Sequence, residues 1–280
     1  MNFNSSVIDI IKERKSKRTY TNHALSTDII EKIQQLLSYY KLGPMGNIVS
    51  FSLIEKEFAK ENHKVKIGTY GFISGAQYFI SGEVKKGAFC FEDFGYLLEK
   101  IILHLTELKH GTCWLGGTFN RSDFAKILNS DKEILIPAIT PVGYADDTKT
   151  IMENIIRWAA KANNRLEWNQ LFFNNNFSNP LQMEEAKDYE LPLEMVRLAP
   201  SASNKQPWRI IKSNGNFHFY LKRTSGYKMF GNVDLQKVDM GIAMAHFELT
   251  CNQLGLIGNW KNNKLVLETS QLEYIISWQV

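Results

Sequence analysis

Apolar residues recur at helical spacing in several stretches of the chain. Two long stretches, residues 91–110 and 238–254, are apolar around most of a helical circumference, so both are predicted to be buried core helices. Capping residues Ser5-Ser6 precede a short helical pattern that runs into a basic cluster, and Ser26 precedes another. The remaining helical patterns lie at residues 29–40, 122–128 and 193–198.

Runs of apolar and β-branched residues between these helices predict strands. They lie at residues 48–54, 75–81, 134–144, 208–212, 217–222 and 273–280. Pro137 and Pro141 within the third run indicate an edge strand or an irregular one, because proline cannot donate to a sheet ladder. Helices and strands in this arrangement predict an α+β fold class.

The order of predicted elements occurs twice: helix, loop, strand, strand, long helix, glycine, strand. The long helix of the first copy ends at Gly111 and that of the second at Gly255. We interpret the repeat as an internal duplication, with two similar α/β halves packed as an intramolecular pseudo-dimer. The expected halves are residues 1–155 and 156–280.

Composition describes a soluble globular protein with a small positive charge. A chain of 280 residues, 44% of them hydrophobic, can bury a sizeable core. Its net charge of +4 comes from 33 basic and 29 acidic residues spread along the chain, so no nucleic-acid partner is expected. The weak excess suits an anionic small ligand.

Other features of the sequence indicate the expected cellular location and argue against several kinds of functional site. Three widely spaced cysteines argue against a disulfide framework, and no apolar run reaches membrane-helix length, so a cytoplasmic location without membrane attachment is expected. His110 and Cys113 lack a second ligand pair, so no metal site is expected. His104 and His246 lie in apolar helices and are interpreted as core histidines. No P-loop, G-x-G-x-x-G or G-x-S-x-G motif occurs.

Two polar motifs stand out at opposite ends of the chain. Residues 200–208 read P-S-A-S-N-K-Q-P-W, a loop whose hydroxyl and amide groups offer donors and acceptors to the edge of a planar heterocycle. Arg14-Lys15-Ser16-Lys17-Arg18 concentrates cations and a hydroxyl that suit a phosphate and a polar ribityl chain. Each alone is also compatible with an ordinary connection or a solvated helix end.

Together, the two motifs resemble those of the FMN-dependent nitroreductase family. In that family the working unit is a homodimer, and FMN lies at the interface between the first-helix motif of one subunit and the Ser- and Asn-bearing loop of the other. Here residues 43–47, G-P-M-G-N, stand where the first half would carry that loop. Residues 164–168, N-R-L-E-W, stand where the second half would carry the basic motif. The resemblance therefore implies one complete site per chain, acting as a monomer.

The resemblance also assigns roles to residues of the first half. Arg14, Lys15 and Ser16 would hold phosphate or ribityl oxygens. Arg18 would reach the pyrimidine side of the ring and stabilise the anionic reduced flavin, which makes it a catalytic candidate. The stretch Leu115-Gly116-Gly117 matches the segment that offers a backbone N–H to flavin N5, with Gly116 as the expected donor and second catalytic candidate.

In the second half, the resemblance implies a loop contact and a phosphate contact. The loop residues expected to bind the cofactor are Pro200, Ser201, Ser203 and Asn204, whereas residues 206–208 would fix the loop. Arg165 is the best candidate for a further phosphate contact, with Lys161 second. Residues 225–235 are equally compatible with a cover over the cleft and with a plain surface loop.

The implied activity is hydride transfer by a ping-pong mechanism. NAD(P)H would reduce the flavin at N5 and leave before a small-molecule acceptor, such as a nitroaromatic or a quinone, takes the same place. Two alternatives stay open. One is another branch of the same fold, acting in flavin breakdown or reductive dehalogenation, and the other is a non-enzymatic flavin-binding protein.

Overall fold

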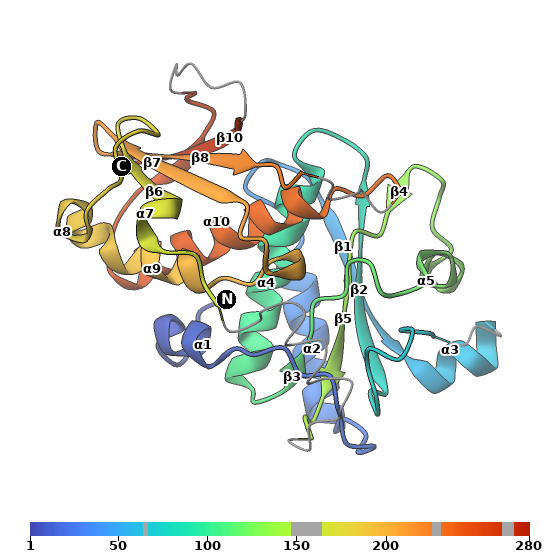
Figure 1. The fold of residues 1–280 in the computed structure, drawn as a ribbon. Coiled ribbons are helices and arrows are strands. Elements are labelled where there is room, and N and C mark those ends of the chain that lie inside the picture. Colours follow the sequence, from blue (N-terminus) through green and yellow to red (C-terminus); the bar gives the residue numbers. More distant parts are fainter. Residues whose placement is uncertain (64–66, 147–163, 226–230, 265–271) are drawn as a thin grey trace.

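The structure, a computed structural model, describes residues 1–63, 67–146, 164–225, 231–264 and 272–280. The chain forms two α/β halves, each built on one sheet, with two long helices between the sheets (Figure 1). These helices are α4 (Cys90–Glu107) of the first half and α10 (Leu235–Gln253) of the second. Each half therefore contributes one of the two central helices.

The sheet of the first half is antiparallel throughout. Its strands are β1 (Val49–Glu55), β2 (Tyr78–Lys85), β3 (Gly111–Thr112), β4 (Ile134–Leu135) and β5 (Ile139–Gly143). They run in the order β1-β2-β5-β3, and β4 pairs with the far end of β2. Its helices besides α4 are α1 (Val7–Glu13), α2 (Thr27–Tyr39), α3 (Lys56–His63) and α5 (Arg121–Leu128).

The sheet of the second half runs β6-β7-β8-β10-β9. Its strands are β6 (Phe172–Asn174), β7 (Trp208–Ser213), β8 (Asn216–Lys222), β9 (Asn259–Lys261) and β10 (Leu272–Gln279). Only the β6–β7 pair among these is parallel. The other helices of this half are α7 (Trp168–Leu171), α8 (Met183–Ala186) and α9 (Glu190–Leu198), with short 3-10 turns at Lys187–Tyr189 and Ala202–Asn204.

The two central helices cross where each carries a glycine. A Cβ on Gly95 would lie 2.1 Å from the backbone oxygen of Val238, and one on Gly241 would lie 1.9 Å from that of Glu92. Val238 precedes Gly241 by three positions, and Glu92 precedes Gly95 by the same number (241 − 238 = 95 − 92 = 3). Each glycine thus contacts the residue three positions before the other glycine. Two elements related by a two-fold axis make contacts of this kind, so α4 and α10 meet as equivalent helices of a pseudo-dimer.

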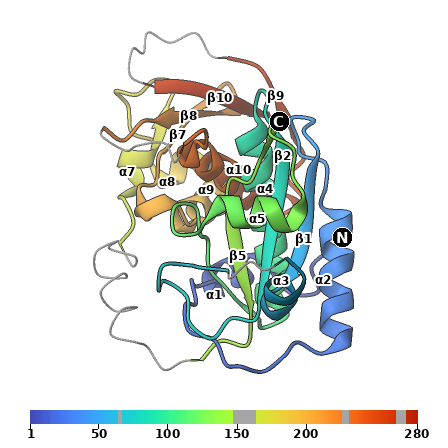
Figure 2. The same cartoon turned by 90° about the vertical axis from the view of Figure 1, so that its right-hand side faces the viewer.

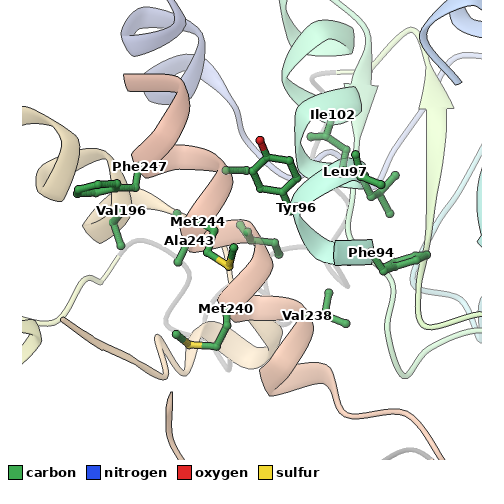
Figure 3. Close-up of a cluster of buried hydrophobic side chains, with 14 of the residues drawn as sticks. Phe94, Tyr96, Leu97, Ile102, Val196, Val238, Met240, Ala243, Met244 and Phe247 are labelled. Atoms are coloured by element: carbon green, nitrogen blue, oxygen red, sulfur yellow. The ribbon is translucent and has the colours of Figure 1, made fainter. Parts of the chain in front are cut away.

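Side chains from both central helices build one continuous core. Phe94, Leu97 and Ile102 of α4 are buried, as are Met240 and Phe247 of α10, and Val196 of α9 joins them (Figure 3). Turned by a quarter circle, the molecule shows α2 along the outer side of β1 and α5 beside the first sheet (Figure 2). Burial on several faces explains why the long helices lack a polar stripe in the sequence.

Most of the predicted elements are confirmed, and so is the order that repeats in the two halves. Both long helices, the short helices and the strands β1, β7, β8 and β10 lie where the hydrophobic pattern predicts them. The first half differs from the second by α3, which is inserted between β1 and β2 and which the sequence pattern does not predict. The expected boundary between the halves, at residues 155 and 156, lies outside the described residues.

Two predictions about the first half are wrong in detail, and one open alternative is decided. The run 134–144 is two strands, because Pro137 separates β4 from β5. Of the two alternatives for this run, an edge strand or an irregular one, the irregular one is confirmed by this interruption. β5 itself lies between β2 and the two-residue β3, and β3 pairs only with Val142 and Gly143, so it does not pair with Pro141. Finally, β2 begins at Tyr78 and extends to Lys85, which the prediction left outside the strand.

Within the described ranges, no helix combines the length and the apolar character that a membrane crossing requires.

Candidate active site

A cavity of about 610 Å³ lies between the two halves. Its walls come from the end of α1 and the segment that follows it, from residues 114–118, from Arg165, from residues 200–204 and from the first turns of α10. All twelve residues named as site candidates from the sequence line it: Arg14, Lys15, Ser16, Arg18, Leu115, Gly116, Gly117, Arg165, Pro200, Ser201, Ser203 and Asn204. Arg14 and Asn204, which belong to opposite halves, thus share one cavity.

The basic cluster reaches the cavity as extended chain. Helix α1 ends at Glu13, whereas the sequence placed the cluster on the helix itself. Ser16 bridges to Thr112 in parallel register, Lys17 N–H donates to Thr112 O at 2.8 Å, and Arg18 O accepts from Ser74 N–H at 2.9 Å. Because side chains alternate along extended chain, Arg14, Ser16 and Arg18 share one side of this segment and line the cavity.

Arg14 is tied to a buried network that joins both central helices. Its Nε lies 3.7 Å from Oε1 of Glu99, a carboxylate on α4 with no exposed surface. The same Glu99 accepts from Trp114 Nε1 at 2.7 Å and is bonded to His246 Nε2 of α10 at 2.8 Å. His246 Nδ1 bonds the carbonyl of Met195 at 2.9 Å, so this histidine is a satisfied core residue, as expected.

Two of the guanidinium groups that line the cavity, those of Arg14 and Arg18, retain polar atoms without hydrogen-bond partners among the described residues. Arg14 Nε and Arg18 Nη1 are buried and make no hydrogen bond. Arg165 donates to Asn204 Oδ1 at 3.2 Å and to Leu198 O at 3.0 Å. Burial and, to a smaller extent, the nearby charges of Arg14 and Arg197 together lower the pKa of Arg165 to about 10. Cations from opposite ends of the chain are thus held close enough to repel each other.

The segment 114–117 is fixed on both sides. Leu115 exchanges two backbone hydrogen bonds with Ile139 of β5, at 2.9 and 3.0 Å. Arg121 donates to the carbonyl of Gly116 and, at 3.0 Å, to that of Pro137. A Cβ on Gly116 would approach a methyl group of Leu235 of α10 to 2.6 Å, so a larger residue here would require the Leu235 side chain to shift. The expected role of its N–H at flavin N5 stays a prediction.

The loop 200–204 is held in a strained conformation. Ser203, Asn204 and Gln206 all have positive φ angles, of 51°, 54° and 47°, which non-glycine residues adopt at a cost. Hydrogen bonds maintain them: Gln206 N–H donates to Ser201 Oγ at 2.8 Å, and Leu166 N–H donates to Gln206 Oε1 at 2.9 Å. As expected from the sequence, Gln206 fixes the loop and does not line the cavity.

Charge in the cavity is strongly one-sided. Among the described residues, five basic side chains line it, those of Lys12, Arg14, Lys15, Arg18 and Arg165, and one carboxyl group, that of Asp239. Asp239 is 2% exposed and accepts from Ala202 N–H at 2.8 Å through Oδ1. Burial raises the pKa of Asp239 well above its ordinary value. An arrangement of this kind favours an anion with several oxygen acceptors.

Sequence reasoning missed four contributors to the site: Phe72, which lines the cavity, and Glu99, Arg121 and Asp239. A signal existed for two of them. Glu99 and Asp239 are acidic residues inside the two most apolar helical patterns, where an acid has to be paired, functional or protonated. Phe72 and Arg121 lie in segments whose pattern indicates no site.

Two further expectations concern metals and the cover of the cleft. Among the described histidine, cysteine, aspartate and glutamate residues, no group could hold a metal ion. Lys161 and residues 226–230 of the expected cover lie outside the described residues. His104, the other histidine expected in the core, is bonded to the hydroxyl of Tyr40 at 2.7 Å, and its burial lowers its pKa to about 4.

The chain matches a known protein family in sequence and known proteins in structure. The model of the family described as "Putative TM nitroreductase" matches residues 6–251, which is 246 of the 280 residues (251 − 6 + 1). A nitroreductase-like protein from Thermotoga maritima MSB8 shares the fold at a TM-score of 0.64 and 17% identity, over 100% of this chain and 95% of that one. No curated protein matches the chain.

Shorter structures match only part of the chain. A nitroreductase family protein from Clostridium novyi NT is 20% identical at a TM-score of 0.43, over 54% of this chain and 91% of that one. An FMN-dependent nitroreductase from Clostridium difficile R20291 is 20% identical at a TM-score of 0.41, over 51% and 90%. With the family model spanning most of its length, and with a cavity between two equivalent halves, this chain belongs to the nitroreductase family.

Proposed function

We propose that the chain is an FMN-dependent oxidoreductase that uses NAD(P)H to reduce a nitroaromatic, a quinone or a similar small acceptor. The observation that carries the proposal is the shared cavity. It joins a cationic segment from the start of the chain to an amide- and hydroxyl-bearing loop of the second half, although 186 positions separate Arg18 from Asn204 (204 − 18 = 186).

The residues present fit FMN. The cavity volume, about 610 Å³, falls within the range of pockets that hold small molecules and cofactors. Arg14 and Arg18 keep buried N–H groups without hydrogen-bond partners among the described residues, and a phosphate and a flavin ring would supply acceptors. The mutual repulsion of Arg14 and Arg165 would be relieved by a phosphate between them.

When bound, FMN would supply the redox chemistry, taking a hydride from NAD(P)H and giving it to the acceptor. The chain's own groups would bind and polarise the cofactor. Arg14, Lys15, Ser16 and Arg165 would hold the phosphate and ribityl oxygens. Arg18 would place a fixed cation near the pyrimidine edge of the ring, and the rigid segment at Gly116 would offer a backbone N–H.

The structure supports one such site per chain. In the first half, residues 43–47 occupy the place of loop 200–204, and their backbone is packed against α4: a Cβ on Gly43 would lie 2.2 Å from Cγ of Asp93. This loop lines no part of the cavity. Because Met45 and Asn47 are bound to Asp93, this loop would offer fewer free groups to a second flavin than loop 200–204 offers to the first.

The proposal is tested on the freshly purified protein. An absorption spectrum should show bound flavin, and anaerobic addition of NADH or NADPH should bleach it. Arg18→Ala and Asn204→Ala should each lower flavin content. A colourless protein that binds no added FMN would contradict the proposal. Bound flavin that neither nucleotide reduces would instead indicate a non-enzymatic flavin-binding protein.

A further inference from the structure

Two aspartates occupy equivalent positions on the central helices. Asp93 lies two residues before Gly95 on α4, and Asp239 lies two residues before Gly241 on α10 (95 − 93 = 241 − 239 = 2). Each accepts a hydrogen bond from the backbone of a loop of its own half, which precedes β1 in the first half and β7 in the second: Met45 N–H for Asp93, at 2.9 Å, and Ala202 N–H for Asp239, at 2.8 Å. The pseudo-symmetry therefore makes each aspartate the anchor of one loop.

The first of these aspartates is saturated by its loop. Asp93 Oδ1 accepts from Met45 N–H, and Oδ2 accepts from both the backbone and the side-chain amide of Asn47, at 2.9 and 2.8 Å. Nothing remains for a ligand to bind. Asp93 therefore serves as the reference for Asp239: at this position of the fold, both carboxylate oxygens can be bonded by the adjacent loop.

The second aspartate is only half satisfied. Asp239 Oδ2 is buried and has no hydrogen-bond partner among the described residues, although the residue lines the cavity. Asn204, which stands two residues after Ala202 as Asn47 stands after Met45, is turned elsewhere. Its Oδ1 accepts from Arg165 Nη1 at 3.2 Å, and its Nδ2 donates to Asn164 O at 2.8 Å. In the first half, the loop thus supplies hydrogen-bond donors to both oxygens of Asp93. In the second half, the equivalent loop leaves Oδ2 of Asp239 without a donor from its own backbone or side chains.

We propose that Asp239 is a cofactor-contact residue, whose Oδ2 donates a hydrogen bond to an oxygen or nitrogen acceptor of bound FMN while Oδ1 holds loop 200–204. The inference rests on the proposed function and adds to it a contact that the basic segment and the loop motif do not contain. Leaving a buried polar atom without a partner costs about 1–3 kcal/mol, and this contact would recover it.

The surroundings of Asp239 favour its neutral form. Burial raises its pKa well above the ordinary value, the hydrogen bond from Ala202 opposes this shift, and the charge of Asp234, the N-cap of the helix, adds to it. Lys237 of that helix pairs with Glu92 of α4 and with Glu273 of β10, and the cavity cations Arg14, Arg18 and Arg165 form no ion pair with Asp239. A buried carboxylic acid kept neutral in this way acts as a hydrogen-bond donor.

The first test is an FMN titration of apo-protein, followed by flavin fluorescence. Asp239→Asn keeps an oxygen for Ala202 and a donor for the ligand, so its Kd should stay within about threefold of wild type. Asp239→Ala should raise the Kd by about 10- to 100-fold, the equivalent of a lost hydrogen bond of about 1–3 kcal/mol. Asp93→Ala is the matched control: it frees the equivalent loop anchor away from the cavity and should leave the Kd unchanged.

Loss of the anchor could itself loosen loop 200–204, so a second measurement is independent of it. Infrared difference spectra of FMN binding, wild type minus Asp239→Asn, should contain the C=O band of a protonated carboxyl group that shifts on binding. An absent or unshifted band would overturn the inference, as would a Kd for Asp239→Asn as poor as that for Asp239→Ala. Failure of wild type to bind FMN at all would instead contradict the proposed function.

Discussion

Glu99 connects parts of the site that come from the two halves of the chain. It belongs to the first half, yet it contacts the cation of the basic segment, the indole of the segment at Gly116 and a histidine of the second half. A buried carboxylate in such a network is costly to alter, because each partner it leaves is also buried.

Replacing Glu99 by Gln tests this dependence. The amide keeps the volume but loses the negative charge that attracts the Arg14 guanidinium. We expect the free energy of unfolding to fall by about 3–5 kcal/mol and FMN affinity to fall with it, because Arg14 loses its anchor. Urea unfolding and FMN titration measure the two effects. Glu57→Gln, in an exposed pair with Lys60, is the control and should behave like wild type. Unchanged stability would show that Glu99 is not a structural centre.

Sequence reasoning finds residues of this site when they belong to a continuous motif. The basic segment and loop 200–204 are local patterns, so their residues could be named from the chain alone, although the roles assigned to them stay predictions. Glu99 gains its meaning only when α4 and α10 cross, because it is bonded to His246, 147 positions further along the chain. Asp239 gains its meaning only when loop 200–204 folds onto the start of α10, where Ala202 donates to it. Arg121 likewise acts through backbone carbonyls that the fold, not the sequence, brings to it.

At the scale of elements, the crossing of α4 and α10 holds the halves in register. Its closeness depends on the two glycines, and it places acidic groups where water does not reach. Glu92 has no exposed surface, makes no hydrogen bond through its side chain to any described residue, and has Lys237 3.8 Å away. The hydrophobic pattern predicts both helices correctly but not how near they approach.

A pH dependence of stability follows from Glu92. Burial raises its pKa from 4.5 to about 7, so the native state binds its proton more tightly than the unfolded state does. The resulting stabilisation is complete below pH 4.5 and is lost as the pH rises towards 7. Glu92→Gln should therefore gain stability relative to wild type between these pH values, by up to about 3 kcal/mol. Urea unfolding from pH 4.5 to 8 measures the gain, and a constant difference over this range would contradict the prediction.

The glycine crossing gives a second prediction at this scale. Gly241→Ala would force a methyl group against the backbone oxygen of Glu92, so the helices would have to separate. We expect a loss of about 1–3 kcal/mol in the free energy of unfolding. Gly87→Ala is the control, because a Cβ there would meet nothing nearer than 3.7 Å. Thermal unfolding compares the two variants. Equal effects would mean that the crossing tolerates more space than its geometry indicates.

At the scale of the whole molecule, the chain is a pseudo-dimer whose halves are no longer interchangeable. The first half supplies the basic segment and the segment at Gly116, and the second supplies loop 200–204 and the open aspartate. The element order that repeats in the sequence predicts this architecture. It does not predict that Asp93 closes the loop of one half while Asp239 leaves the other open, because that difference lies in loop conformation.

The stoichiometry of cofactor binding tests the asymmetry. With residues 43–47 bound to Asp93, we expect one FMN per chain at saturation. Comparing flavin absorbance with protein concentration determined by amino-acid analysis measures the ratio. Two flavins per chain would show that the first half retains a site of its own.

The covalent joining of the halves has a consequence for how such a protein changes over generations. In a homodimer, every substitution is present in both subunits. A substitution that stabilises a loop in one subunit therefore also changes the same loop where it lines a site. Here the gene carries each copy separately. Residues 43–47 can therefore be bound to Asp93 while residues 200–204 line the cavity, and a designer can alter one loop without changing the other.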